Sequence, residues 1–273
     1  MTEQQRIAVL GGGNLGLAMT EGWLAAGVSP ASLYVTRRSV ERLECLAARG
    51  VSTSADNTAA ARFARALVVS VRPGQLDALL AEIAPALRPE EHIVMSTVSG
   101  VSIAQIRERL AVDVPVVRVM PTIAVAVRES MTCLACTEDT SDVAMAQAEA
   151  IFGQLGTTLA IREEQMTPAT ALCACGVAFF LRAIRAASQG GVQVGFHADE
   201  AIRLAAQTAR GAATLLLDGT AQHPETVIDS VTTPLGVTIA GLNEMEHSGF
   251  SSAMIRGIVV AAGKAAGLYV GGA

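Results

Sequence analysis

An aliphatic strand that runs through a glycine turn into a helical segment constrains this chain more than any other feature. The sequence from Arg6 to Gly16 reads RIAVLGGGNLG, and helical spacing follows it. Gly11, Gly13 and Gly16 fit G-x-G-x-x-G: the first glycine allows a tight turn, the second lets a pyrophosphate approach, and the third lets the helix pack on the strand. Amides at the start of such a helix attract phosphates. We therefore expect a dinucleotide-binding loop made of Gly11, Gly12, Gly13, Asn14, Leu15 and Gly16.

The rest of the first half alternates short apolar runs with segments of helical periodicity. Strands are expected at residues 32–36, 66–71, 92–96, 114–120, 124–127, 131–135 and 157–161, with an extended segment at 51–57. Helices are expected at residues 40–49, 76–87, 103–110 and 141–155. This alternation is typical of an α/β fold with a parallel sheet. Residues 1–162 are therefore predicted to form a Rossmann-type, doubly wound dinucleotide-binding domain.

The second half has a different character, because no β-like run of useful length follows Arg162. Helices are expected at residues 163–189, 198–217, 224–231, 235–247 and 251–268. Residues 163–273 are therefore predicted to form an all-α domain. The chain has a mean hydropathy of +0.43 but only 3% aromatic residues. Because so apolar a half has few aromatic side chains to fill a core alone, we expect it to pair with a second copy as a homodimer.

The residues after the second expected strand select the cofactor. An acidic residue there would bind the ribose hydroxyls of NAD, whereas arginine accommodates the 2′-phosphate of NADP. This chain has Arg37, Arg38 and Ser39, and Ser39 is a candidate N-cap for the next helix. These residues favour NADPH, and NADH remains the alternative.

Composition excludes several other functions. The net charge is −5 and no block of lysine and arginine occurs, so we expect no nucleic-acid partner. The longest apolar stretches, such as 166–181, contain Thr and Pro and stop at Arg182, which is short of a membrane-spanning helix. The start of the chain, MTEQQR, lacks the basic-then-apolar order of a signal peptide. We therefore expect a cytoplasmic protein without a membrane partner.

The cysteines and histidines indicate packing more than chemistry. Cys133 and Cys136 form a C-x-x-C, but no second pair and no nearby histidine accompany it, so packing is favoured over metal or redox chemistry. No metal site is expected. The four histidines lie near expected element ends and are predicted to be surface residues, with no role as a catalytic base: His92, His197, His223 and His247.

Several motifs, spread over nearly the whole chain, together resemble the pyrroline-5-carboxylate reductases. GGGNLG is similar to the family's cofactor loop, and Asn57 resembles its adenosine-side asparagine. The other matching segments are Val71-Arg72-Pro73, Ser96 to Val101 (STVSGV), Val117 to Pro121 (VRVMP), Glu163 to Phe180 (the family's dimer helix) and Thr233 to Thr238 (TPLGVT).

The resemblance implies NAD(P)H-dependent reduction of the cyclic imine 1-pyrroline-5-carboxylate to L-proline, by a dimer or a larger ring of dimers. On the cofactor side it adds Asn57, Val71, Arg72, Pro73, Ser99, Gly100 and Pro121. On the substrate side it points to Thr233, Pro234, Gly236, Val237, Cys175 and Gly176. Thr233 as N-cap and Pro234 at the first helical position would begin a helix whose free amides suit a substrate carboxylate. Thr238 resembles the threonine that hydrogen-bonds the imine nitrogen.

The chain departs from the family pattern where the substrate and nicotinamide should bind. The family's S-G-S-G-P-A-Y segment reads CACGVAF at residues 173–179, and Leu235 and Val237 replace small residues of an S-P-G-G-x-T loop. Pro168 interrupts the first long helix and marks a later helix start. Two alternatives therefore stay open: reduction of a different cyclic imine, or nucleotide binding without turnover.

Overall fold

The computed structural model describes residues 6–219 and 223–267, and it divides the chain into two compact units. One unit runs up to Ala174 and also includes the chain from Ala261 onward. The other is Cys175–Val260. The domain boundary predicted after residue 162 stays a prediction.

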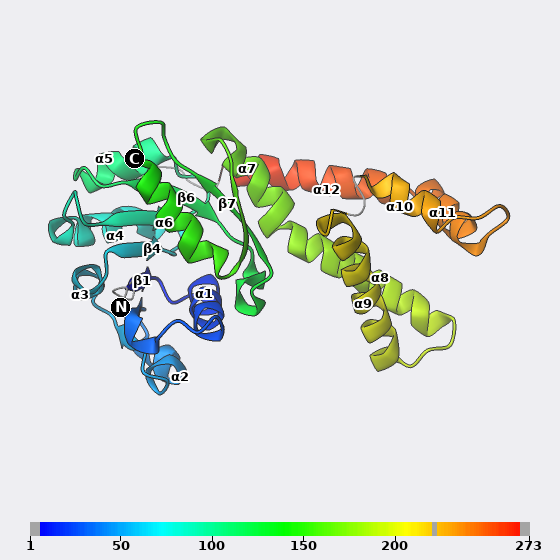
Figure 1. The fold of residues 1–273 in the computed structure, drawn as a ribbon, viewed down its shortest axis with the longest axis horizontal. Coiled ribbons are helices and arrows are strands. Elements are labelled where there is room, and N and C mark those ends of the chain that lie inside the picture. Colours follow the sequence, from blue (N-terminus) through cyan, green and yellow to red (C-terminus); the bar gives the residue numbers. More distant parts are fainter. Residues whose placement is uncertain (1–5, 220–222, 268–273) are drawn as a thin grey trace. The chain divides into compact units, whose positions relative to one another are not determined.

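The first unit contains an eight-stranded sheet of order β3-β2-β1-β4-β5-β6-β7-β8 (Figure 1). Its strands are β1 (Ile7–Leu10), β2 (Leu33–Thr36), β3 (Ser52–Ser54), β4 (Ala66–Val69), β5 (Ile93–Ser96), β6 (Val116–Met120), β7 (Ser130–Ala135) and β8 (Gly156–Ala160). Every neighbouring pair is parallel except β6 and β7. The chain crosses over between β3 and β4, so the strand order reverses between β1 and β4. The predicted doubly wound sheet is confirmed.

Helices cover both faces of this sheet, which is why its central strands are apolar on both sides. They are α1 (Asn14–Ala25), α2 (Glu44–Ala47), α3 (Asn57–Phe63), α4 (Leu76–Ile83), α5 (Ile103–Leu110) and α6 (Asp142–Gly153). One core includes Trp23 of α1 and Phe152 of α6, whose rings meet edge to face at 5.9 Å. A second core includes Leu80 of α4 and Ile106 of α5. Both faces of the sheet are therefore filled.

Two local predictions are wrong, and one helix was not predicted. Residues 124–127 belong to a 3₁₀ helix, Ile123–Val127, because the Thr122 hydroxyl accepts a hydrogen bond from the Ala124 amide and caps this turn. Helix α3 was missed although Asp56 caps it by accepting from the Ala59 amide at 2.8 Å. The helix expected at residues 40–49 is a 3₁₀ turn, Val40–Leu43, followed by the short α2. Apolar runs this short do not distinguish helix from strand by periodicity.

His92 also differs from its prediction, because it is buried and not a surface residue. Its Nε2 lies 3.0 Å from the Ala61 carbonyl oxygen, and its Nδ1 accepts a hydrogen bond from the Arg88 amide at 3.0 Å. The ring thus ties the turn before β5 to α3. The other three histidines are exposed, as predicted.

The predicted all-α second half is confirmed. It contains α7 (Met166–Ala169), a π-helical turn (Thr170–Ala174), α8 (Gly176–Gln193), α9 (Ala198–Leu217), α10 (Pro224–Ser230), α11 (Val237–His247) and α12 (Phe250–Ala265). Pro168 lies in the first turn of α7, where a missing amide costs no helical bond. The π-helical turn follows it, and the Thr170 hydroxyl donates to the Met166 carbonyl at 2.9 Å.

Candidate functional site

The glycine loop has a backbone that side chains would disrupt at two of its three motif positions. Gly11 has a φ of 115°, and a Cβ there would lie 2.2 Å from the Ser70 carbonyl oxygen on the chain after β4. A Cβ on Gly16 would lie 2.2 Å from the Gly11 carbonyl oxygen. Gly13 is different, because it is exposed and a Cβ there would meet no protein atom within 4 Å. Only an added ligand would require glycine at this second position of the motif.

The start of α1 can receive an anion. The helix begins at Asn14, and its N-cap Gly13 supplies no side-chain hydrogen bond. The amides of its first turn therefore have no capping acceptor. Gly13 and Asn14 are exposed and Leu15 is half-buried, so a phosphate can approach these amides from solvent.

The arginines after β2 lie beside this loop. The amides of Gly11 and Gly12 both donate to the Thr36 carbonyl, at 3.2 and 2.6 Å, which joins the loop to the end of β2. Arg37 donates from Nη1 to the Gly12 carbonyl at 2.7 Å. Arg38 is exposed, and so is Ser39, which stands at the N-cap position of the next 3₁₀ turn without a side-chain capping bond. The two exposed side chains remain available to a ligand.

Asn57 lies at the same edge of the sheet. Its Oδ1 accepts from the Thr36 hydroxyl at 2.6 Å, and its Nδ2 donates to Glu82 Oε2 at 2.9 Å. These contacts hold the carboxamide beside the end of β2, and its adenosine-side role stays a prediction.

The remaining predicted cofactor residues follow the carboxyl ends of parallel strands. Val71, Arg72 and Pro73 follow β4, Ser99 and Gly100 follow β5, and Pro121 follows β6. Carboxyl ends of parallel strands meet at one edge of a sheet, and ligands of doubly wound folds bind there, where the strand order reverses. The fold therefore brings these residues to the same edge as the glycine loop, although Pro121 itself is buried.

The predicted substrate turn has a different geometry from the one expected. Thr233 is not the N-cap and Pro234 is not the first helical residue, because α11 begins at Val237 with Gly236 as its N-cap. Thr233 and Pro234 instead belong to a β-turn closed by a 2.9 Å bond from the Gly236 amide to the Thr233 carbonyl. Leu235 occupies the third position of this turn with a φ of 59°, and the helix starts at Val237, three residues after Pro234.

Gly236 and Thr238 keep features that suit a ligand. A Cβ on Gly236 would lie 2.5 Å from Thr233 Oγ1, so the turn requires glycine there. The Thr238 side chain is half-buried in the first turn of α11, and its hydroxyl makes no hydrogen bond within residues 6–219 and 223–267. Cys175 and Gly176 begin α8 in the same unit, and no hydrogen bond joins them to this turn within the described residues.

Comparison with known proteins identifies the family. A family model described as pyrroline-5-carboxylate reductase dimerisation matches residues 163–268, and one described as NADP oxidoreductase, coenzyme F420-dependent, matches residues 6–100. Pyrroline-5-carboxylate reductase 2 of Dictyostelium discoideum is 44% identical over 280 residues, which cover 97% of this chain and 93% of that protein. This chain belongs to the pyrroline-5-carboxylate reductase family.

Other members of the family agree in sequence and in fold. Pyrroline-5-carboxylate reductase 1 of D. discoideum is 50% identical over 96% of this chain. The match covers only 50% of the length of that relative. The solved pyrroline-5-carboxylate reductase of Coxiella burnetii has a TM-score of 0.88 at 28% identity, and the match covers 98% of this chain and 100% of that one. The Plasmodium falciparum pyrroline carboxylate reductase, solved with NADP bound, has a TM-score of 0.88 at 22% identity over 99% of this chain and 100% of that one. At that identity the second structure supports the fold alone.

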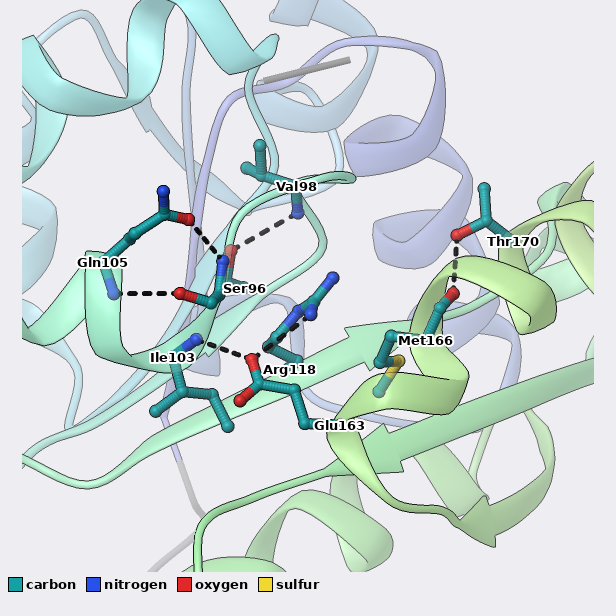
Figure 2. A network of polar contacts seen from close by, with 9 residues as sticks. Ser96, Val98, Ile103, Gln105, Arg118, Glu163, Met166 and Thr170 are labelled. Atoms are coloured by element: carbon teal, nitrogen blue, oxygen red, sulfur yellow. Dashed lines mark hydrogen bonds and ion pairs between the residues drawn. The ribbon is translucent and has the colours of Figure 1, made fainter. Parts of the chain in front are cut away.

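A buried ion pair lies where the match to the family's dimerisation model begins, and the sequence analysis missed it. Arg118 on β6 is 6% exposed and pairs with Glu163 at 3.2 Å. Figure 2 shows the Glu163 carboxylate directed at both the Arg118 guanidinium and the Ile103 amide, to which it is bonded at 2.7 Å. Burial lowers the pKa of Arg118, while the hydrogen bond and charge of Glu163 raise it. The pair thus joins β6, the start of α5 and the turn before α7. An arginine within an apolar strand was its one signal in the sequence.

Proposed function

We infer that this protein reduces 1-pyrroline-5-carboxylate to L-proline with NAD(P)H. The observation that carries the inference is family membership at 44% identity over almost the full length of a pyrroline-5-carboxylate reductase. An intact glycine loop supports it, because Gly11 and Gly16 meet backbone atoms that exclude any side chain, and Gly13 is open to a ligand. The reaction adds a hydride to the imine carbon and a proton to the imine nitrogen.

The residues of this chain mainly position the reactants. The cofactor fits the carboxyl edge of the sheet, where the amides at the start of α1 bind its pyrophosphate. A bound reduced nicotinamide supplies the hydride. The Thr238 hydroxyl hydrogen-bonds the imine nitrogen, as donor to the neutral imine or as acceptor from the protonated one, and so orients the ring. The amides at the start of α11, from Val237 onward, bind the substrate carboxylate. A hydroxyl is a poor acid, so the proton comes from solvent or from an already protonated imine.

NADPH is the preferred cofactor in this proposal. Arg38 and Ser39 are exposed beside the glycine loop, and Arg37 is held there by the Gly12 carbonyl. Their donors suit a 2′-phosphate, and an acidic partner for ribose hydroxyls is absent from residues 37–39. Arg38→Ala should raise the Kd for NADPH about tenfold and leave that for NADH unchanged. An equal loss for both cofactors would exclude 2′-phosphate recognition by this residue.

A homodimer completes the proposal, and larger rings of such dimers are compatible with it. Within the described part of Cys175–Val260 only Gly176, Ser188 and Ala201 are buried, whereas large side chains such as Phe180 and Leu204 are at least half exposed. So little burial does not stabilise a helical unit alone. Among the described residues, the helical stretch Glu163–Gln193, which includes α7, the π-helical turn and α8, is long and apolar enough to cross a membrane by length and composition, contrary to the expectation from residues 166–181. We attribute its apolar surface to the partner subunit, because the match to the dimerisation model includes it. A cytoplasmic location stays a prediction.

The deciding experiment measures NADPH oxidation with racemic 1-pyrroline-5-carboxylate, alongside a panel of cyclic imines of other ring sizes and substituents. The proposal expects turnover that is highest with the five-membered imino acid. An alternative is that the substrate is a different cyclic imine, because residues 173–179 are altered and Leu235 and Val237 are exposed. This alternative predicts that another imine of the panel is reduced faster than 1-pyrroline-5-carboxylate. NADPH binding by calorimetry with no turnover on any imine would indicate a nucleotide-binding protein without catalysis.

The role of Thr238 has a matched control. Thr238→Ala should lower kcat/KM about 10- to 100-fold without changing the Kd for NADPH, because it removes one hydrogen bond made to the reacting ring. Thr226→Ala changes an exposed threonine of α10 and should leave both quantities unchanged. Equal effects of the two substitutions would remove the assigned role of Thr238.

A further inference from the structure

Two cysteines that lie 40 residues apart in the sequence face each other in the first unit. Cys133 is on β7 and Cys173 is in the π-helical turn after α7, and their sulfur atoms are 4.0 Å apart. Cys133 is 3% exposed, whereas Cys173 is half-buried. Within a single subunit Cys173 is therefore the more exposed member of the pair.

The surroundings of the pair are apolar. Met120, Ala135, Met166, Ala169, Ile161 and Ala174 pack around the two thiols. The contact with the Cys133 thiol lowers the pKa of Cys173 to about 7, against an opposing effect of burial. The same contact, together with burial, raises the pKa of Cys133. The proton is therefore lost more easily from Cys173 than from Cys133, and a thiolate beside a neutral thiol is the division of roles that thiol oxidation requires.

We propose that Cys133 and Cys173 are a thiol-oxidation site that closes to an intramolecular disulfide under hydrogen peroxide. The Cys173 thiolate attacks one peroxide oxygen, which gives a sulfenic acid and releases hydroxide. The Cys133 sulfur then displaces the hydroxyl group from Cys173, and its own proton leaves with that group as water. Two thiols lose two electrons and peroxide gains them.

Closure requires the two sulfur atoms to move toward each other. The sulfurs must approach from 4.0 Å to about 2.05 Å, and the strand is fixed by its neighbours in the sheet. The approach must therefore come from the Cys173 side chain and the π-helical turn that carries it. Oxidation therefore draws the beginning of the helical region toward β7.

The test uses the full-length reduced protein, native, with a few equivalents of hydrogen peroxide. Free thiols are then blocked, and the digest is analysed by mass spectrometry. We expect a linked peptide pair joining Cys133 to Cys173, reversed by dithiothreitol, and a fall in titratable thiols from five to three. No substrate is needed, so the result is independent of the proposed catalytic function.

Variants separate this site from the neighbouring thiols. Cys173→Ser should abolish the linkage and leave Cys133 fully alkylated after peroxide and unfolding. Cys175→Ser is the matched control, two residues away, and should form the Cys133–Cys173 link as the unchanged chain does. A native protein in which Cys133 and Cys173 both remain alkylatable after peroxide would overturn the proposal, and so would a link between Cys173 and Cys175.

Discussion

Replacing each of two glycines of the glycine loop with alanine should affect two different properties. Gly16→Ala should lower the stability of the fold, and Gly13→Ala should weaken the binding of NADPH. In Gly16→Ala the new Cβ lies 2.2 Å from the Gly11 carbonyl oxygen and 3.1 Å from a methyl group of Val9. The first contact is with backbone, more than about 1 Å inside ordinary contact, so α1 must shift away from β1. Overpacking of this kind costs about 3 kcal/mol, which lowers Tm by about 6–12 °C in a chain of this size.

In Gly13→Ala the new methyl group meets no protein atom within 4 Å. Gly13 has a φ of −77° and a ψ of −167°, which alanine adopts freely. The protein should lose only about 0.5–1 kcal/mol, because alanine is a poorer N-cap than glycine. The methyl group instead occupies the space through which a pyrophosphate approaches the first amides of α1. A loss of about 2–3 kcal/mol there raises the Kd for NADPH roughly 30- to 140-fold.

The assay pairs thermal unfolding with a fluorescence titration of NADPH for both variants. Gly13→Ala should keep nearly the original Tm without cofactor and lose most of the Tm increase that NADPH produces. Gly16→Ala should have a low Tm before any cofactor is added. The reasoning is refuted if Gly13→Ala binds NADPH with unchanged Kd, or if it loses as much stability as Gly16→Ala.

Three further predictions concern groups outside the loop. Glu163→Gln leaves the buried Arg118 charge without its counter-ion and should lower the free energy of unfolding, measured in urea, by about 2 kcal/mol. The control Glu164→Gln changes an exposed residue and should alter that free energy by no more than about 0.5 kcal/mol. Equal losses in the two variants would contradict the role of the pair. Trp23→Phe removes the indole N–H that donates to the Ile151 carbonyl at 2.9 Å, and it should lower the free energy of unfolding by about 2–3 kcal/mol, measured by circular dichroism. A loss under about 0.5 kcal/mol would contradict this prediction. Hydrogen bonds from Thr137 and Arg107 lower the pKa of Asp139. The ion pair between Asp139 and Arg107 should therefore be present above the ordinary aspartate pKa and be lost as pH falls through the lowered pKa. NMR titration of the Asp139 carboxyl group checks this, and an ordinary aspartate pKa would contradict it.

Local signals in the sequence were sufficient for the main architecture. The glycine loop, the alternation of strands and helices, and the change to helix after Arg162 each depend on residues close together in the chain. Pro168 was also interpreted correctly as a helix start, since the constraint of proline acts on its own backbone. Family motifs then indicated the reaction.

Predictions failed where local signals compete. Thr233 and Pro234 are a common helix start, but Leu235 adopts a left-handed conformation that delays α11 to Val237. His92 lies in a turn and is nevertheless buried, because its ring Nε2 bonds to the Ala61 carbonyl oxygen, 31 residues away in the sequence. In the first case one adjacent residue overrides a common pattern, and in the second a distant residue decides the outcome.

The sequence by itself therefore determined the fold class, the position of the glycine loop and the family, because periodicity and glycine spacing are properties of adjacent residues. Only the tertiary structure decided which distant side chains meet. Arg118 and Glu163 are 45 residues apart and Cys133 and Cys173 are 40 apart, and each pair forms because the sheet brings β6 and β7 beside the chain that enters the helical region. Contacts of this kind depend on the path of the whole backbone, which no local pattern specifies.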